Sequence, residues 1–436
     1  MNLISFIHLS DIHFNKNSGG PYDIDADLRN EVLLDIKENY LPIKKDNRGI
    51  LVCGDIAFSG KEEEYKTAEE FLNKICDDIE VDRSSVFCVP GNHDIDQNIP
   101  NNFPHIKSIQ SDLASQKDIL SYNDKLGEIL RSEEAAQLLY MPLEKYNTVF
   151  AEQYNCSLHP NKLQWEEKMI LSDKYDLCII GMNSTIISNS DDHATQSERL
   201  MKMSEIQVPK REPRTIFLTL CHHPPECWDD PEGEIANKMC NRVAVQLYGH
   251  KHEQAIEMKA KSLIIKSGAT QPSRWEDGWI PRYNWVELEI GIEGNKDVLI
   301  VRIYPRVYDK AKNRFVCDYK LTSENQFVEY SLTIGEIPSI ECEHIVNHHV
   351  AANQENAKCE IDQEHYEDNT WKRKTVYEFS QLPYITQCEI LKNLGYEKQQ
   401  YNGKRPSQVV SEIMINKERL LHAEKIKLEV DKRKGF

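Results

Sequence analysis

Five short apolar segments of this chain each run directly into residues that can bind metal ions or transfer protons. The segments and the residues that follow them are Leu3–Leu9 with SDIH, Ile50–Cys53 with GD, Val86–Val89 with PGNHD, Thr215–Leu220 with CHHPP, and Val243–Tyr248 with GHKH. If the segments are strands, these polar residues stand at their carboxyl ends, where open α/β sheets place ligands. Any one of the five could be an ordinary turn, but five in series indicate a shared site.

The order of the strand-like and helix-like segments predicts an α/β fold built from two sheets. Over the first 310 residues, strand-like segments alternate with amphipathic stretches such as Asp27–Tyr40 and Glu62–Ile79, as in layered α/β domains. Between residues 255 and 304 the strand-like segments follow one another closely, which is typical of antiparallel sheet. We therefore expect a two-sheet sandwich flanked by helices, with a small helical C-terminal module.

Changes in composition divide the chain into parts with different expected roles. Residues 1–310 are expected to form the core, with a polar, helix-rich, cap-like insertion at about 95–165. Residues 311–372 are expected to be an irregular extension or linker, and residues 373–436 a small helical module. A module of about 60 residues buries little core by itself. It is therefore expected to dock onto the main domain, to bind a protein partner or to self-associate.

Two features of the C-terminal part carry more specific expectations. One helix is expected over Val409–Val430, where apolar residues recur on one face. Three histidines of the linker, His344, His348 and His349, lie among carboxylates but match no standard spacing of metal ligands. They are interpreted as incidental residues of a linker.

Charge and cysteine usage narrow the class of protein. The net charge of -18 argues against a nucleic-acid binder that uses its whole surface. The twelve cysteines are scattered without a CxxC pair, and the first residues lack the pattern of a secretory signal. Buried thiols in a cytoplasmic protein are expected from these features. No apolar run approaches the length that spans a bilayer, so no membrane association is expected.

The residue types at the five strand ends suit a pair of divalent metal ions. Two such ions, about 3.5–4 Å apart, clamp a phosphate ester and activate water between them. Carboxylate, amide and imidazole ligands suit manganese, iron and zinc better than thiolates would. In an extended chain, alternate side chains point to the same side. This alternation would aim Asp11 and His13 together, and likewise His250 and His252.

The order DxH, GD, GNHD, H and GHxH resembles that of the calcineurin-like metallophosphoesterases over about residues 1–310. Within that superfamily, HLSDIHF, HHPP and GHKH are most similar to the bacterial class III cyclic-nucleotide phosphodiesterase branch. The resemblance implies two divalent metal ions, manganese foremost, with iron or zinc as alternatives. The implied ligands are Asp11, His13 and His252 for the first ion, Asn92, His222 and His250 for the second, and Asp55 for both.

The resemblance also implies roles for the remaining polar residues. A hydroxide bridging the ions would attack phosphorus, and His93 would protonate the leaving oxygen. Asp94 is expected to brace the turn or the metal ligands. His223 is the less favoured alternative to His222 as a metal ligand, and either histidine could instead touch substrate. One position departs from some branches of the family, which place a carboxylate three residues after the bridging Asp to orient the histidine. Here that position is Phe58.

The substrate is left open between a small nucleotide and a nucleic acid. A phosphodiesterase for a small or cyclic nucleotide is favoured, but Mre11-like DNA or RNA nucleases use a similar ligand order, and silent scaffolds occur in this fold. Acids downstream of His222 would repel a long polyanion unless they begin a helix; they are Asp229, Asp230, Glu232 and Glu234. A basic groove could offset them, formed by Arg274, Arg282, Arg302 and Arg306.

Two further segments bear on the substrate and on partners. Arg274 lies in the tryptophan-rich loop 267–285, which could hold a base and a phosphate or simply pack over the second sheet. The C-terminal module weakly resembles small helical adaptor domains that tether bacterial effector enzymes to larger assemblies. That resemblance implies an enzyme working within a multi-component system.

Overall fold

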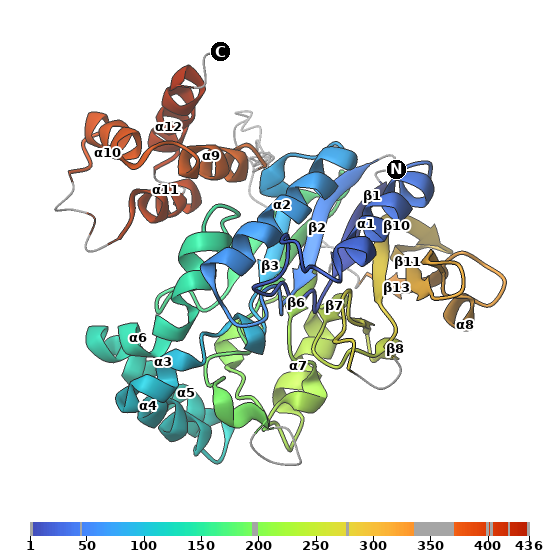
Figure 1. Ribbon diagram of the computed structural model, residues 1–436, viewed down its shortest axis with the longest axis horizontal. Coiled ribbons are helices and arrows are strands. Elements are labelled where there is room, and N and C mark those ends of the chain that lie inside the picture. Colours follow the sequence, from blue (N-terminus) through green and yellow to red (C-terminus); the bar gives the residue numbers. More distant parts are fainter. Residues whose placement is uncertain are drawn as a thin grey trace, which may run out of the picture.

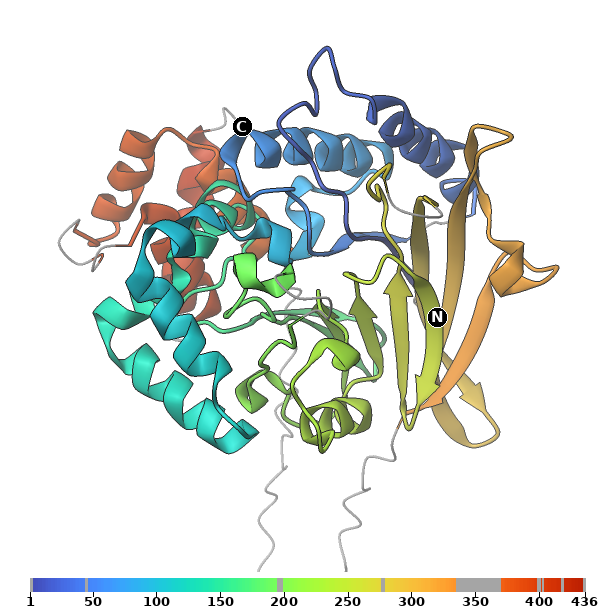
Figure 2. The same ribbon diagram turned by 60° about the horizontal axis from the view of Figure 1, so that its bottom comes forward.

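The structure is a computed structural model of the chain, with two mixed β-sheets packed face to face and helices on the outside (Figures 1 and 2). This is the predicted fold class, which is thereby confirmed. The structure describes residues 3–43, 46–193, 199–275, 279–334, 370–397, 401, 404–416 and 419–433. Within these residues, every helix is too short or too polar to cross a membrane.

The first sheet has seven strands in the order β12-β11-β10-β1-β2-β3, with β13 also paired to β11. Strands β1, β2 and β3 are parallel, whereas β10 to β13 are antiparallel additions on the β1 side. The strands span β1 Leu3–Leu9, β2 Asn47–Cys53, β3 Val86–Val89, β10 Arg282–Glu293, β11 Lys296–Asp309, β12 Arg314–Cys317 and β13 Val328–Thr333.

The second sheet has six strands in the order β4-β5-β6-β7-β9-β8. Its four central strands are parallel and its two edge strands are antiparallel. The strands span β4 Trp165–Ile170, β5 Asp176–Gly181, β6 Thr215–Cys221, β7 Val245–Tyr248, β8 Gln254–Lys259 and β9 Ser262–Ser267.

The parallel strands are buried on both faces, which explains their continuous apolar sequences. In β6, Leu218 and Leu220 belong to the core that joins the two sheets, whereas Phe217 and Cys221 pack on the opposite face. That opposite face is covered by α7 (Glu234–Arg242), whose Met239 lies in the same cluster. The alternation along β6 therefore fixes which residues lie between the sheets.

Helices cover the rest of the sandwich. Helices α1 (Ala26–Asp35) and α2 (Glu62–Asp78) contribute buried residues to the main core from the first-sheet side (Figure 2). The short helices between strands are η1 Ile36–Tyr40, η2 Arg83–Ser85, η3 Asn92–Asp94, η6 Ser190–His193, η7 Glu205–Gln207, η8 Pro225–Cys227 and α8 Tyr319–Thr322.

The insertion after β3 forms a helical lobe at one side of the sandwich (Figure 1). Pro104 occupies the first turn of α4 and Asp118 caps α5, since its carboxylate accepts the backbone N–H of Ser121 at 2.8 Å. The helices of the lobe are α3 Asn98–Asn102, α4 Pro104–Ala114, α5 Ile119–Arg131, α6 Glu133–Tyr140, η4 Met141–Leu143 and η5 Tyr146–Ala151.

Within its described residues, the C-terminal module has four helices around a small core of its own. It lies against one side of the main domain (Figures 1 and 2). Arg373 is 4% exposed, and its guanidinium donates to the backbone carbonyls of Ser84 in η2 and of Val86 at the start of β3. The helices are α9 Thr370–Ser380, α10 Tyr384–Asn393, α11 Pro406–Ile415 and α12 Leu420–Arg433.

The structure differs from the expected boundaries at two places. The first sheet continues past residue 310 through β12 and β13, so residues 314–333 are not the irregular segment that the sequence suggested. The helix expected over Val409–Val430 is two helices, because Asn416 takes an extended conformation after α11. The linker histidines His344, His348 and His349 lie outside the described residues.

Candidate metal centre

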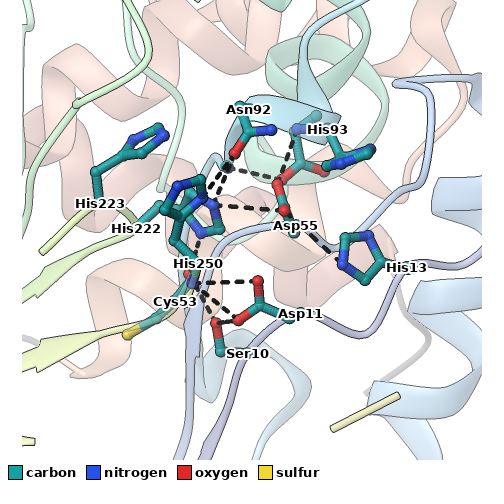
Figure 3. A network of polar contacts seen from close by, with 12 residues as sticks. Ser10, Asp11, His13, Cys53, Asp55, Asn92, His93, His222, His223 and His250 are labelled. Carbon is teal, nitrogen blue, oxygen red and sulfur yellow. Dashed lines mark hydrogen bonds and ion pairs between the residues drawn. The ribbon is translucent and has the colours of Figure 1, made fainter. Parts of the chain in front are cut away.

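The polar residues after five parallel strands meet at one edge of the sandwich (Figure 3). Strands β1, β2 and β3 of the first sheet and β6 and β7 of the second all end there. Parallel strands necessarily present their carboxyl ends at the same edge, so the loops from both sheets converge. The loops bring together Asp11, His13, Asp55, Asn92, His93, His222, His223, His250 and His252.

One group of ligand atoms comes from the loops after β1 and β7. The Nε2 atom of His252 lies 3.4 Å from Oδ1 of Asp11 and 3.5 Å from Nε2 of His13. The Asp11 carboxylate is buried, while His252 is partly exposed. These three residues are the ones that the resemblance assigns to the first metal ion.

A second group comes from the loops after β3, β6 and β7. The Oδ1 atom of Asn92 lies 3.0 Å from Nε2 of His222 and 3.1 Å from Nδ1 of His250. Asn92 and His222 are buried and His250 is partly exposed. The resemblance assigns this set to the second metal ion.

Asp55 stands between the two groups. Its Oδ2 atom is 3.8 Å from Nε2 of His13 and 3.4 Å from Nε2 of His222. Its Oδ1 atom accepts the backbone N–H of His93 at 2.8 Å. The side chain therefore reaches both groups from a fixed position, as a ligand shared by two ions would.

The donor chemistry of the site fits divalent cations. The Nδ1 atom of His222 lies 2.9 Å from the backbone carbonyl of Cys53, and a carbonyl only accepts, so Nδ1 carries the proton. The lone pair on Nε2 then faces the Asp55 carboxylate and the Asn92 side chain. Burial lowers the pKa of His222, so Nε2 is not protonated and its lone pair is repelled by the oxygen atoms around it. A bound cation would remove this repulsion by accepting these lone pairs as ligands.

The charged groups of the centre influence one another's pKa. Burial raises the pKa of Asp11 and of Asp55, but the neighbouring histidines outweigh it, and both pKa values fall below the ordinary value. For Asp11 the main partner is His252, and for Asp55 it is His222. Burial lowers the pKa of His13 to about 4. The two carboxylates are thus ionised and the imidazoles of His13 and His222 neutral near pH 7, which is the state that binds metal ions.

The backbone that carries the ligands is not extended, so the expected alternation of Asp11 with His13 and of His250 with His252 is wrong. Five ligand residues have left-handed φ angles: Asp11 51°, His13 52°, Asp55 49°, His250 72° and His252 54°. The chain turns after β1 because the backbone N–H groups of Ile12 and His13 both donate to the carbonyl of Asp55, at 2.9 and 3.0 Å. Each such residue costs about 1–3 kcal/mol, and such strain concentrates at functional sites.

Two glycines allow the loops to approach this closely. Gly54 has φ +83°, and a Cβ there would lie 2.6 Å from Nδ1 of His222. A Cβ on Gly91 would overlap the Asp55 carboxylate. The glycines of the GD and GNHD motifs therefore make room for the residues that face the metal ions.

His93 is oriented by the backbone of Phe58, at the position where a carboxylate partner is missing. Its Nδ1 atom lies 2.8 Å from the Phe58 carbonyl, so Nδ1 carries the proton and Nε2 is the atom that exchanges protons. The imidazole ring stands 4.8 Å from the His13 ring, centroid to centroid. His93 is thus held at the edge of the metal ligands although no carboxylate follows Asp55 in the motif.

Asp94 lies beneath the loop that carries Asn92 and His93. Its carboxylate accepts the backbone N–H groups of Gly91 at 2.8 Å, Ala57 at 2.9 Å and Ile56 at 3.2 Å. Burial, followed by the charge of Asp55, raises the pKa of Asp94 to about 7. The residue ties the loops after β2 and β3 together and does not face the ligand atoms.

His223 and His222 differ in where they point (Figure 3). Nε2 of His222 lies near Asp55, whereas Nδ1 of His223 lies 2.8 Å from Oγ of Ser184. The hydroxyl oxygen of Ser10 lies 2.5 Å from Oδ2 of Asp11 and 3.0 Å from the Cys53 carbonyl, so its single proton is shared between these two acceptors. Neither Ser10 nor Ser184 was predicted as a site residue from the sequence. Ser10 directly precedes the DxH motif, but the chain around Ser184 carries no comparable signal.

The four arginines proposed as a basic groove are all paired with carboxylates. Arg274 donates to Asp25 at 2.6 Å, Arg282 to Asp318 at 2.6 Å and Arg302 to Glu289 at 2.9 Å. Arg306 is buried against Asp35, with Nε 2.8 Å from Oδ2. Each guanidinium is neutralised by a carboxylate, so this set does not compensate the acidic surface.

The acidic residues after His222 have structural partners. Asp229 pairs with Lys202 at 2.5 Å. Asp230 accepts the backbone N–H groups of Glu234 at 2.8 Å and of Ile235 and Ala236 at 3.0 Å, at the start of α7. Asp230 is therefore at the start of a helix, as one of the two alternatives for these acids predicted.

Comparison with known proteins gives distant relatives. The chain is 23% identical over 278 residues to the "Uncharacterized metallophosphoesterase-like protein YydB" of Bacillus subtilis (strain 168), a match covering 61% of this chain and 53% of YydB. The chain thus spans about half the length of that relative. A putative 5′-nucleotidase from Staphylococcus aureus aligns with TM-score 0.35 and 11% identity, over 77% of this chain and 55% of that one. GAP50 of Plasmodium aligns with TM-score 0.36 and 10% identity, over 77% of this chain and 90% of that one.

The comparison with protein families settles the membership. The family described as "Calcineurin-like phosphoesterase" matches residues 4–254, which include all seven assigned metal ligands. The family implies a metal-dependent phosphoester hydrolase, in agreement with the clusters of possible metal ligands at the strand ends. This chain belongs to the calcineurin-like phosphoesterase family.

Proposed function

We propose that the protein is a phosphodiesterase that hydrolyses a small or cyclic nucleotide with the help of two divalent metal ions. The observation that carries the proposal is the position of Asp55, whose Oδ2 atom faces His13 of one ligand group and His222 of the other. Oxygen and imidazole ligands without thiolate favour Mn²⁺, with iron or zinc as alternatives. Bound there, the two ions would supply positive charge to the phosphate oxygens and lower the pKa of a water molecule.

Other residues of the chain supply a proton and hold the loops of the site in position. His93 is held through Nδ1 by the Phe58 carbonyl at 2.8 Å. As an imidazolium it would donate its Nε2 proton to the leaving oxygen and be left as the neutral ring that keeps its proton on Nδ1. Asp94 keeps the loop of Asn92 and His93 against the loop of Asp55 through its three backbone hydrogen bonds. The buried carboxylates of Asp11 and Asp55 remain ionised and keep the metal ligands in place.

The charge distribution supports a small substrate over a nucleic acid. A nuclease tracks its substrate with cationic side chains that are free to contact phosphates. Arg274, Arg282, Arg302 and Arg306 are all paired with carboxylates, and the chain carries a net charge of -18. A nucleotide with one phosphodiester needs no such track. Cleavage of DNA or RNA is therefore kept as an outcome of the test.

Motif likeness and thiol content support the finer assignments. HLSDIHF, HHPP and GHKH favour the class III cyclic-nucleotide phosphodiesterase branch. The ten cysteines within the described residues are free thiols and support a reducing, cytoplasmic location. We further propose that the C-terminal module, which docks on β3 through Arg373, binds a protein partner with its remaining surface.

A substrate panel tests the proposal. The protein loaded with Mn²⁺ is incubated with 2′,3′- and 3′,5′-cyclic nucleotides, bis(p-nitrophenyl) phosphate, p-nitrophenyl phosphate, and single- and double-stranded DNA. Asp55→Ala serves as the control for contaminating hydrolases. We expect turnover of a cyclic nucleotide and of bis(p-nitrophenyl) phosphate, both lost in Asp55→Ala. Turnover of the monoester alone, or of DNA alone, would contradict the proposed substrate class.

A further inference from the structure

The side chain of Phe58 is exposed beside the metal centre. It is 50% exposed, although Ile56 and Ala57 just before it are fully buried. A single exposed aromatic residue is common on protein surfaces and by itself says little. The position of Phe58 beside two histidines of the site sets it apart from such residues. The Phe58 ring centroid lies 5.3 Å from that of His93, with the rings tilted by 35°, and 6.1 Å from that of His13.

The loop around Phe58 is held firmly on both sides. The backbone N–H of Phe58 donates to the carbonyl of Phe14 at 2.8 Å, and its own carbonyl accepts from His93 at 2.8 Å. The next residue, Ser59, donates to the Glu64 carboxylate through its N–H at 2.9 Å and its hydroxyl at 2.8 Å. The main chain therefore sets where the ring lies, and the ring is preorganised as a contact surface.

The position of Phe58 next to His93 indicates which part of a substrate would contact the Phe58 ring. In the proposed function, His93 protonates the leaving oxygen, so the group attached to that oxygen lies on the His93 side of the phosphate. The Phe58 ring stands on that side, next to the imidazole. A planar group on the leaving alcohol can lie against the ring, whereas a small alkyl group leaves the ring in water.

We propose that Phe58 determines specificity by stacking on the base of the nucleoside that carries the leaving oxygen. This inference rests on the proposed function, because it uses the assignment of His93 to the leaving side. It names the substrate class more closely: phosphodiesters whose leaving alcohol belongs to a nucleoside, as opposed to alkyl phosphodiesters. Phe58, at the position where some relatives have a carboxylate, thus serves twice, with its carbonyl for His93 and its ring for the base.

The test measures binding separately from catalysis. Adenosine 5′-monophosphate and glycerol 3-phosphate, which share a phosphate but differ in the planar base, are titrated by calorimetry into the Mn²⁺-loaded protein. The variants are Phe58→Ala and Phe58→Tyr, and Phe103→Ala is the matched control because Phe103 is likewise 50% exposed but lies at the start of α4. We expect Phe58→Ala to weaken nucleotide binding by about fivefold to 100-fold.

The second ligand, the other variants and the steady-state kinetics each have an expected result. Glycerol 3-phosphate should bind equally well to the wild type and to Phe58→Ala. Phe58→Tyr and Phe103→Ala should keep wild-type affinity for the nucleotide. With a cyclic nucleotide as substrate, Phe58→Ala should raise KM while kcat stays within about twofold.

Two results would overturn the inference. One is equal loss of affinity for both phosphates in Phe58→Ala, which would indicate a damaged metal site. The other is unchanged affinity for the nucleotide. A failure of the proposed function looks different: no nucleotide is turned over by the wild type, while the selective loss of nucleotide binding in Phe58→Ala still supports the role of the ring.

Discussion

At the scale of single residues, a backbone carbonyl does the work that a carboxylate does in some relatives. The Phe58 carbonyl lies 2.8 Å from Nδ1 of His93 and fixes its tautomer. The carbonyl accepts the Nδ1 proton, which leaves Nε2 as the atom that exchanges a proton with the leaving group. The proton donor of this chain is therefore positioned through a main-chain group of the GD loop.

Replacement of His93 tests its role as proton donor. His93→Asn should lower kcat for a cyclic nucleotide by about 10²–10⁴-fold, because the leaving alkoxide then receives no proton. For bis(p-nitrophenyl) phosphate the loss should be much smaller, since nitrophenolate leaves without a proton. Steady-state kinetics on both substrates and metal analysis of the purified variant check this. Equal losses for both substrates, or loss of metal, would instead make His93 a ligand.

At the scale of secondary-structure elements, β3 links the metal centre to the C-terminal module. The carboxyl end of β3 leads into Asn92 and His93, while the carbonyl of Val86 at its start accepts a hydrogen bond from Arg373 of α9. The Arg373 guanidinium also lies 4.2 Å from the Phe87 ring centroid and 3.8 Å from Glu167. The module is thus attached to the strand that carries the proton donor.

Removal of this contact should destabilise the protein. Arg373→Met should lower the free energy of unfolding by about 3 kcal/mol, because it removes the buried hydrogen bonds to the carbonyls of Ser84 and Val86 and the ion pair with Glu167. Lys374→Met is the matched control on the same helix: Lys374 is half exposed and pairs with Asp82 at 3.0 Å, which predicts a change below about 1 kcal/mol. Denaturant titration of both variants checks this, and equal effects would contradict the account.

How far the sequence predicts each element depends on where its partners lie. The parallel strands are buried on both faces, so their apolar runs and the polar residues after them could be predicted locally. The edge strand β13 alternates exposed with partly or fully buried residues, but it is only six residues long and stands next to a long polar stretch, so it was missed. The partners of the arginines are remote, as Asp25 is 249 residues from Arg274. The left-handed turn at His13 likewise depends on the carbonyl of Asp55 in the loop after another strand, β2.

At the scale of the whole molecule, an acid is buried where the C-terminal module meets the main domain. Glu152 is 5% exposed, and its carboxylate accepts a hydrogen bond from the hydroxyl of Ser407 in α11. Burial raises the pKa of Glu152 to about 7. In the unfolded chain the ordinary pKa of about 4.3 applies. As the pH rises between these values, the unfolded chain loses a proton that the folded protein still holds, so stability falls.

The Glu152→Gln variant should not lose stability in this way as the pH rises, because glutamine does not ionise. Above pH 7 the folded protein also ionises Glu152 and bears the full penalty, so the variant should be more stable than the wild type by about 2–4 kcal/mol at pH 8.5. The difference should shrink below about 1 kcal/mol at pH 5. Denaturant titrations of both proteins at the two pH values check this. A difference that does not change with pH would contradict the burial of an acid at this interface.

The stoichiometry of metal binding tests the central claim most directly. Calorimetric titration of the metal-free protein with Mn²⁺, together with elemental analysis after dialysis, should give two ions per chain for the wild type. Asp55→Ala, which removes the carboxylate that faces both His13 and His222, should weaken binding of both ions by at least about tenfold. A single ion per chain, no binding, or two ions bound equally well by Asp55→Ala would contradict a two-metal centre shared through Asp55.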